Sequence, residues 1–355
     1  MKQTAFRSTA LAAALLGCSA LTTAPASAQE PVEITFFIWA GSNQGVVPME
    51  VIDAYKKENP HVTINILESN NTITYPKMVA ARRTTPDDPL VHCGFFNVDS
   101  MTKGDVDDMW ESLDPALVPN MEKVIEKFRR PDNRGVGYQM SGIGILYNKD
   151  AVKEPPTSWS AMWSEEYRGR VTMFDYDTRM MVVASMLNGG DERNMDPGFQ
   201  TWSDNAENLK ALVDSNDALK NLLVAGDAWI APWFSSLAHV WIEEGAPLGF
   251  AVPDEGAIAF PIFLTVANGV DDAERKVCSD LVNTLLSPEN AGRYGQLTFS
   301  IPVVEGASAT EEQENDPTLN LDLAKDAIVP DYSHIAEMTP DWRQRWDREV
   351  KFKLR

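Results

Sequence analysis

Hydrophobic residues change their spacing twice near the start of the chain. Apolar side chains occupy alternate positions over residues 32–38, which is typical of a strand, and recur at helical spacing over 47–59, after a Gly- and Asn-bearing loop at 41–45. Alternation returns over 62–66, so the pattern predicts a strand, a loop, a helix and a second strand. Such a βαβ unit places its first loop at the carboxyl edge of a parallel sheet, where ligands bind.

The same kind of pattern recurs further along the chain. Residues 90–96 indicate a third strand, and residues 171–174, 178–187 and 227–231 indicate a strand, a helix and another strand. We therefore expect an α/β fold with two lobes, each a mixed but mostly parallel sheet flanked by helices. The two lobes share an architecture without sharing a sequence repeat.

Two short apolar stretches, 142–147 and 248–252, fall where the chain has to cross between the lobes, and we expect both to be hinge strands. The crossings divide the chain into a discontinuous first lobe, residues 29–140 and 253–305, and a second lobe, residues 141–252. The C-terminal segment, residues 306–355, is expected to pack on the lobes.

Signals for helix ends are clear in the last third of the chain. A capped helix is expected to follow Asp271 as far as Leu286, and Ser287-Pro288 is typical of the start of another helix. Residues 306–317 are rich in Glu, Asn and Ala and predict an exposed loop.

The first residues of the chain predict export. Lys2 and Arg7 precede an apolar run at 10–16, and the small residues 26–28 follow, so residues 1–28 are expected to be a secretory signal peptide. The alternative is a lipoprotein signal that anchors the chain through Cys18. Both interpretations predict a periplasmic protein, because no later apolar run approaches the ~18 residues of a membrane span.

The 355-residue chain is strongly acidic, with 52 Asp and Glu against 31 Lys and Arg and a formal net charge of −21. Such a surface repels nucleic acid and anionic lipid, and we expect neither as a partner. The four histidines are too scattered for a metal cluster, so we expect no metal and no other cofactor. They are His61, His92, His239 and His334.

Two cysteines remain after residue 28, and their spacing leaves open whether Cys93 and Cys278 form a disulfide. Cys278 lies in an apolar stripe at helical spacing, where a buried small hydrophobic residue is the commoner interpretation.

One pattern suggests an enzyme. Ser100 to Lys103 fits S-x-x-K and residues 203–205 fit S-D-N, which are two of the three signatures of penicillin-interacting serine enzymes. The third signature, K-T-G, does not occur in the sequence. Serine acyl transfer by Ser100 and Lys103 is therefore kept only as a remote alternative, and no catalytic residue is expected.

An ordered series of short motifs extends from Val32 to Val303. The motifs are residues 34–39 (ITFFIW), 67–72 (LESNNT), 156–159 (PTSW), 226–229 (GDAW), 244–248 (EGAPL), 252–256 (VPDEG), 286–289 (LSPE) and 301–302 (IP). Together they resemble the spermidine/putrescine-binding protein family. The resemblance implies a two-lobed periplasmic binding protein that closes on a solute and presents it to an ATP-driven permease.

The resemblance also implies which positions hold the ligand. Polyamine binders of this family grip two amines with carboxylates; this chain keeps Asp177 but has Met180 and Ile262 where those proteins have Glu and Asp. An ammonium buried without a counter-charge costs several kcal/mol, so a linear polyamine is disfavoured.

What remains is an aromatic box with one or two acids, which suits a single amine or a quaternary ammonium. Core packing is the alternative interpretation for each ring. The expected contacts of this kind are Trp39, Phe96, Tyr176, Trp233 and Phe260, together with Asp175 and Asp177.

Polar contacts are expected where strands end. Asn70, Asn71 and Asn97 are candidates for the ligand's polar groups, and helix capping is the alternative for the first two. Asp99 is expected to cap the helix that follows it.

Two further ligand classes stay open because relatives of this group bind aminoalkylphosphonates and ferric iron. An anionic head group suits the start of the helix after Gly45. Iron is disfavoured, because the adjacent Tyr pair used by such relatives is absent around Tyr294.

The sequence as a whole predicts the solute-binding component of an ABC importer. We expect a periplasmic monomer, not an enzyme, that captures a small polar solute, with an organic amine as the first choice. Its other partner is the inner-membrane permease.

Overall fold

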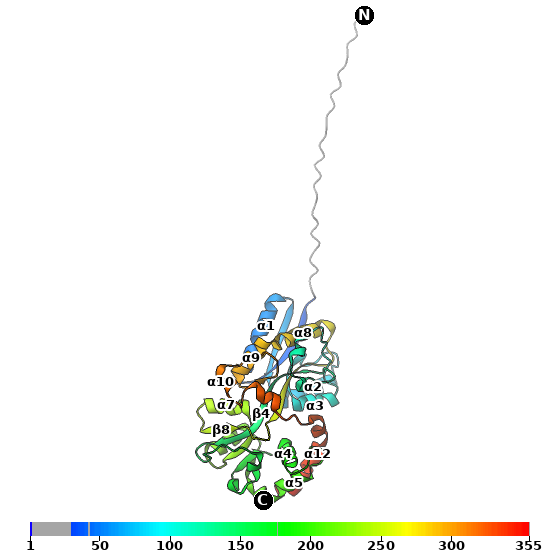
Figure 1. Ribbon diagram of the computed structural model, residues 1–355. Coiled ribbons are helices and arrows are strands. Elements are labelled where there is room, and N and C mark those ends of the chain that lie inside the picture. Colours follow the sequence, from blue (N-terminus) through cyan, green and yellow to red (C-terminus); the bar gives the residue numbers. More distant parts are fainter. Residues whose placement is uncertain (2–29, 42, 176, 355) are drawn as a thin grey trace.

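The computed structural model describes Met1 and residues 30–41, 43–175 and 177–354. The described residues form a mixed sheet of ten strands that runs through the whole molecule (Figure 1). Its order is β2–β1–β3–β9–β4–β7–β5–β6, and β8 and β10 also pair with β4. The strands are β1 (Val32–Trp39), β2 (Val62–Ser69), β3 (Cys93–Asn97), β4 (Val136–Asn148), β5 (Val171–Phe174), β6 (Leu209–Val213), β7 (Ile230–Phe234), β8 (Leu248–Ala251), β9 (Ile258–Val266) and β10 (Ile301–Pro302).

The predicted βαβ unit is confirmed. β1 pairs with β2 in parallel, from Val32 opposite Val62 to Trp39 opposite Ser69, and α1 (Val46–Glu58) connects the two strands. β3 lies parallel to β1 on its other side, and α2 (Asn71–Arg82) precedes it. The three parallel strands therefore bring their carboxyl ends to one edge of this half of the sheet.

β4 is the strand that both halves of the sheet share. All of its residues are buried; its first part pairs with β9, and its second part pairs with β7 and β8. Ile143 is where the two halves meet, because it lies opposite both Ile258 of β9 and Phe234 of β7. The stretches predicted as hinge strands are both strands, the first of them as part of the longer β4.

The second half of the sheet contains β5, β6 and β7 in parallel. β5 and the helix α4 (Thr178–Leu187) have the predicted bounds, whereas β7 begins at Ile230 and not at residue 227. The sequence analysis did not identify β6 or the buried β9. Three more helices flank this half, α5 (Asp196–Asp204), α6 (Asn216–Val224) and α7 (Ser235–Glu243).

The helices in the last third of the chain pack against both halves of the molecule. α8 (Asp272–Leu285) starts at the predicted Asp271 cap, which forms a capping box with Glu274, and α9 (Pro288–Thr298) follows it. α11 (Leu321–Asp326) contacts β4 and β10. The last helix, α12 (Tyr332–Glu349), contacts α3 (Val98–Val106) and α5, and Figure 1 shows it between them along one side of the molecule.

The exposed loop predicted for residues 306–317 is wrong in one part. Residues 311–315 form the short helix α10 (Glu311–Asn315), because Thr310 and Gln313 make a reciprocal capping box. A residue pattern rich in Glu and Asn does not reveal such a turn, although most of the segment is exposed as expected.

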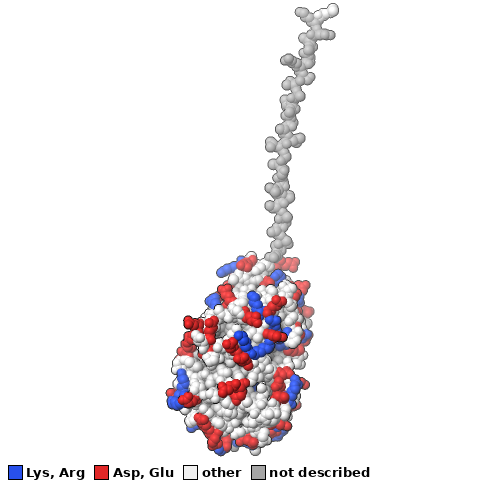
Figure 2. Space-filling view, viewed as in Figure 1, with Lys and Arg blue, Asp and Glu red and all other residues white. Residues whose placement is uncertain are grey.

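Charged side chains of both signs are distributed over the surface. Figure 2 shows acidic and basic residues interspersed on the visible face of both halves. None of the described helices is long and apolar enough to cross a membrane. The predicted signal peptide and Cys18 lie outside the described residues.

Cys93 and Cys278 form a disulfide, which joins β3 to α8 across 185 positions of sequence. The pairing that the sequence left open is present, and the expected burial of Cys278 is confirmed, since both cysteines are fully buried. Helical periodicity identifies the buried face of α8 but carries no information on which strand that face covers. A disulfide of this kind fits a protein that folds in an oxidising compartment.

Replacing both cysteines with alanine is expected to lower stability by about 2–5 kcal/mol, because the bond restricts the unfolded chain over a long loop. Thermal unfolding followed by circular dichroism should show a midpoint several degrees lower. The wild-type protein in a strong reductant should show a similar fall. A double variant with an unchanged midpoint would contradict a stabilising role for the bond.

Candidate ligand-binding site

A cavity of about 360 Å³ lies where three parts of the chain meet. α3 follows β3 of the first half of the sheet, α4 follows β5 of the second half, and α12 closes the third side. The cavity therefore lies between the two halves. Among its described lining residues, the charged side chains and the one phenol are Asp99, Lys103, Asp177, Arg179, Tyr332 and Arg343.

Both sheet-derived helices begin at this cavity, and each start has a side-chain cap. The Asn97 side chain accepts a hydrogen bond from the Ser100 backbone N–H, and the Asp177 carboxylate accepts one from the Arg179 backbone N–H. Asn97, and not the expected Asp99, is thus the cap of α3, which leaves the Asp99 carboxylate free to face the cavity. The first turn of a helix carries a partial positive charge that favours nearby anions.

Arg179 is held in the site by an ion pair and by two aromatic rings. Its Nε donates to Asp177 Oδ1 at 2.8 Å, and its guanidinium carbon lies 5.4 Å and 5.2 Å from the ring centroids of Phe234 and Phe260. Burial by itself lowers the pKa of Arg179, but the carboxylates of Asp177 and Asp99 offset that effect, and the net pKa lies above its usual value. The guanidinium is therefore a permanent cation inside the site.

Tyr332 at the start of α12 connects the cavity to the sheet. Its hydroxyl donates to the Ala259 carbonyl of β9. Burial raises the pKa of Tyr332 despite the opposing effect of Arg179, so the phenol stays neutral and keeps its proton for that hydrogen bond. This contact fixes α12 over the junction of the two halves.

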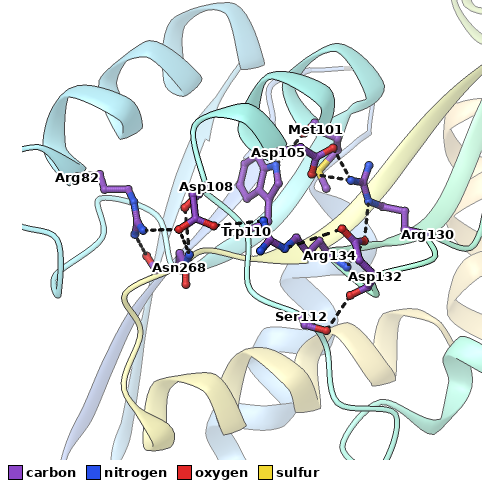
Figure 3. A network of polar contacts seen from close by, with 10 residues as sticks. All are labelled: Arg82, Met101, Asp105, Asp108, Trp110, Ser112, Arg130, Asp132, Arg134 and Asn268. Carbon is purple, nitrogen blue, oxygen red and sulfur yellow. Dashed lines mark hydrogen bonds and ion pairs between the residues drawn. The ribbon is translucent and has the colours of Figure 1, made fainter. Parts of the chain in front are cut away.

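α3 is held from its other end by a network of ion pairs (Figure 3). Arg130 donates to both carboxylate oxygens of Asp105 at 2.6 and 2.5 Å, and the Trp110 indole donates to the Met101 carbonyl at 3.0 Å. Gly104 permits the second contact, because a Cβ at that position would lie 2.0 Å from the Trp110 indole nitrogen. The charged members of the network are Arg82, Arg130, Arg134, Asp105, Asp108 and Asp132.

Of the predicted contacts that lie among the described residues, Asp177 alone lines this cavity. Phe260 is adjacent to it through the Arg179 guanidinium. Trp39 ends β1 half-buried, and its indole N–H has no partner among the described residues. Tyr176 lies outside the described residues.

Two of the predicted aromatic contacts lie in the apolar cores. Phe96 is 1 % exposed and packs against Phe37 and Trp110. Trp233 is 2 % exposed and stacks on Phe174 and Trp241. Sequence reasoning could not separate a ring in a ligand box from a ring in a core, since both occur at strand ends.

The predicted polar contacts have local partners. Asn70 caps α2, and Asn71 accepts a hydrogen bond from the Asn97 backbone N–H. Asp175 pairs with Lys351 near the C-terminus through one carboxylate oxygen. Its other oxygen is buried without a partner in the described part of the chain.

Sequence reasoning missed most of the cavity. Lys103 appeared only within the enzyme-like pattern, and neither Arg179 nor Arg343 was among the expected contacts. No local signal could have joined them, because the three cations come from helices more than seventy positions apart in sequence.

The enzyme-like motifs are not brought together. α3, with Ser100, meets the cavity beside the first half of α12, whereas the Ser203 hydroxyl donates to the Glu349 carbonyl at the other end of that helix. Among the described residues, no group of three or more His, Cys, Asp or Glu is arranged to hold a metal ion.

Comparison with known proteins identifies the family of the chain. The model of the family described as bacterial extracellular solute-binding protein matches residues 91–325. The chain belongs to this family. Its members are substrate-binding components of ABC importers, which are transport proteins and not enzymes.

The chain is also similar to curated relatives and to solved structures of periplasmic binding proteins. The spermidine/putrescine-binding periplasmic protein of Escherichia coli is 25 % identical over 319 residues, which cover 85 % of this chain and 87 % of that protein. The crystal structure of an ABC transporter from Clostridium perfringens covers 89 % of this chain and 99 % of its own at a TM-score of 0.75 and 17 % identity. The periplasmic binding protein AfuA of Actinobacillus pleuropneumoniae, solved with fructose-6-phosphate bound, covers 90 % and 99 % at a TM-score of 0.66 and 16 % identity. The predicted two-lobed fold is thereby confirmed.

Substitution of Arg130 by alanine should destabilise the fold by about 1–3 kcal/mol, because its side chain is 15 % exposed and removal leaves Asp105 without its partner. The matched control is Arg134→Ala, which removes an arginine of the same network that is 35 % exposed and should cost less than about 1 kcal/mol. Urea unfolding of both variants measures the difference. Equal losses would show that burial does not set the strength of this network.

Proposed function

We propose that the chain captures a small solute bearing an acidic group in the cavity between α3, α4 and α12 and delivers it to the permease of an ABC importer. The observation that carries the proposal is the charge of the cavity. Lys103, Arg179 and Arg343 line it, and its two acids, Asp99 and Asp177, both act on the Arg179 guanidinium. Among the described lining residues, cations therefore outnumber acids.

This choice differs from the organic amine that the sequence favoured. An ammonium entering the cavity would meet carboxylates that already compensate Arg179, and it would lie near further cations. A phosphate, phosphonate or carboxylate meets the reverse situation, in which Lys103 supplies a charge-assisted hydrogen bond. The relatives named for spermidine and putrescine are only about a quarter identical, and AfuA has the same fold with a sugar phosphate bound.

The proposed mechanism is closure of two lobes on the solute. We take residues 29–140 with 253–305 as the first lobe and 141–252 as the second, joined at β4 and β8, with residues 306–355 packed on both. A solute that touches α3 and α4 at once binds the closed form more tightly than the open form, and only such a difference in affinity drives closure. The protein acts in the periplasm as a monomer.

Wild-type protein should be stabilised by acidic solutes and not by cations. Thermal unfolding with 2-aminoethylphosphonate and fructose 6-phosphate on one side, and putrescine and choline on the other, tests the solute class. A bound solute raises the midpoint in proportion to the logarithm of its concentration above Kd. A midpoint raised by putrescine but by neither acidic solute would sink the proposal.

Lys103→Ala should weaken binding of the acidic solute tenfold or more, which is ~1.4 kcal/mol per decade. Lys77→Ala is the matched control, because Lys77 is exposed on α2 and does not line the cavity. Titration calorimetry gives both values. Equal affinities for the two variants would remove Lys103 from the site.

A further inference from the structure

We propose that Arg179 sets the ligand class, because its guanidinium fills a cation-binding box between the lobes and so excludes organic cations from the site. This inference rests on the proposed function and names the residue that gives the site its specificity. In this proposal the Arg179 side chain occupies the position that a cationic solute would otherwise take.

The box has the chemistry of a cation site. Phe234 of β7 and Phe260 of β9 meet edge to face with their ring centroids 5.0 Å apart, and the guanidinium lies within 6 Å of both rings. Asp177 supplies a carboxylate at 2.8 Å, and Asp99 adds a second negative charge from α3. Two rings and two carboxylates are the groups by which a protein binds an amine or a guanidine.

The box is assembled from parts of the chain that are distant in sequence. Arg179, Asp177 and Phe234 come from the second half of the sheet and its helix, whereas Phe260 and Asp99 come from the first half. The Arg179 side chain is 17 % exposed, and that of Asp177 is 9 % exposed. The box therefore requires a cation, because removal of the Arg179 side chain leaves the nearly buried Asp177 carboxylate without its partner. This requirement arises only in the folded protein, where the five residues come together.

A tethered cation has a decisive advantage over a free one. Arg179 is covalently part of α4, so its effective concentration at the box far exceeds that of a solute. Its charge is also permanent, because a guanidinium does not lose its proton at any physiological pH. Organic amines therefore cannot displace the Arg179 guanidinium from the box at any physiological pH. The other cations of the cavity, Lys103 and Arg343, lie on helices that meet it from two further sides.

Arg179→Ala tests the inference by emptying the box. The variant should acquire saturable binding of methylguanidinium, seen in calorimetry and as a raised unfolding midpoint, where the wild type shows none. The same variant should bind fructose 6-phosphate, which carries no amine, at least tenfold more weakly, and methylguanidinium should restore part of that affinity. Putrescine should bind the variant but not the wild type.

Two controls separate this role from a general structural one. Asp177→Asn in the Arg179→Ala background keeps a good helix cap but removes the charge, and it should abolish methylguanidinium binding. Arg345→Ala removes a guanidinium that also lies over a ring, 4.2 Å from Phe199, and pairs with Asp196 and Glu349 away from the cavity. It should leave binding of the acidic solute unchanged.

The outcomes distinguish this inference from the proposed function. If wild type binds acidic solutes and folded Arg179→Ala acquires no affinity for methylguanidinium or putrescine, the inference fails and the function stands. If wild type binds no acidic solute but Arg179→Ala acquires cation binding, the function fails and cation exclusion stands. Should the alanine variant not fold, Arg179→Ser, which also empties the space beside the rings, serves the same titrations. Wild-type affinity for putrescine equal to that of either variant overturns the inference.

Discussion

The shared strand β4 is the constraint on which the rest of the structure depends. Its hydrogen bonds run from β9 in the first part to β7 in the second, and the change occurs at Ile143. β3 runs parallel to the first part of β4 and points toward that change, whereas β7 runs antiparallel to the second part and ends there. The carboxyl ends of both half-sheets therefore converge on the middle of one strand, and the helices that follow them begin face to face.

The N-terminal ends of α3 and α4 meet at the cavity, and this arrangement brings like charges together. Two positive helix ends and three basic side chains repel one another unless acids lie among them. Asp177 and Asp99 meet this need, and both act on Arg179, which lies deepest among the aromatic rings. The ion-pair network around Arg130 and the disulfide at Cys93 then hold the first-lobe side of the cavity, since each is attached to β3 or to the helix that follows it.

Local regularities made much of the fold predictable. The β1–α1–β2 unit, β5 and α4 follow from hydrophobic spacing, because each buries one face or one stripe whose period is visible over a few residues. β9 was not predicted because all its residues are buried, so its sequence does not alternate between apolar and polar residues. The start of β7 was misplaced because Gly226 and Asp227 form a turn that the apolar pattern does not separate from the strand.

The site was far less predictable than the fold. Phe96 and Trp233 satisfied every local criterion for a ligand contact, yet packing against Trp110 and Trp241 places both in the cores. Asn70 follows β2 and Asn97 ends β3, where ligand contacts often lie. A residue in that position also has helix N–H groups to cap, and both caps form. What defines the cavity is the meeting of α3, α4 and α12, and no window of sequence contains more than one of them.

A change of ligand class within such a fold requires few alterations. The resemblance to polyamine binders rests on motifs that shape strands and turns, and those motifs are independent of the charge in the cavity. By the resemblance, Met180 near the start of α4 and Ile262 on β9 stand where polyamine binders have acids, and both side chains are buried. The two acids that remain in the cavity, Asp99 and Asp177, are outnumbered by the cations of Lys103, Arg179 and Arg343. The proposed acidic solute is compatible with this balance, because the fold is shared with relatives named for polyamines and does not by itself fix the charge of the cavity.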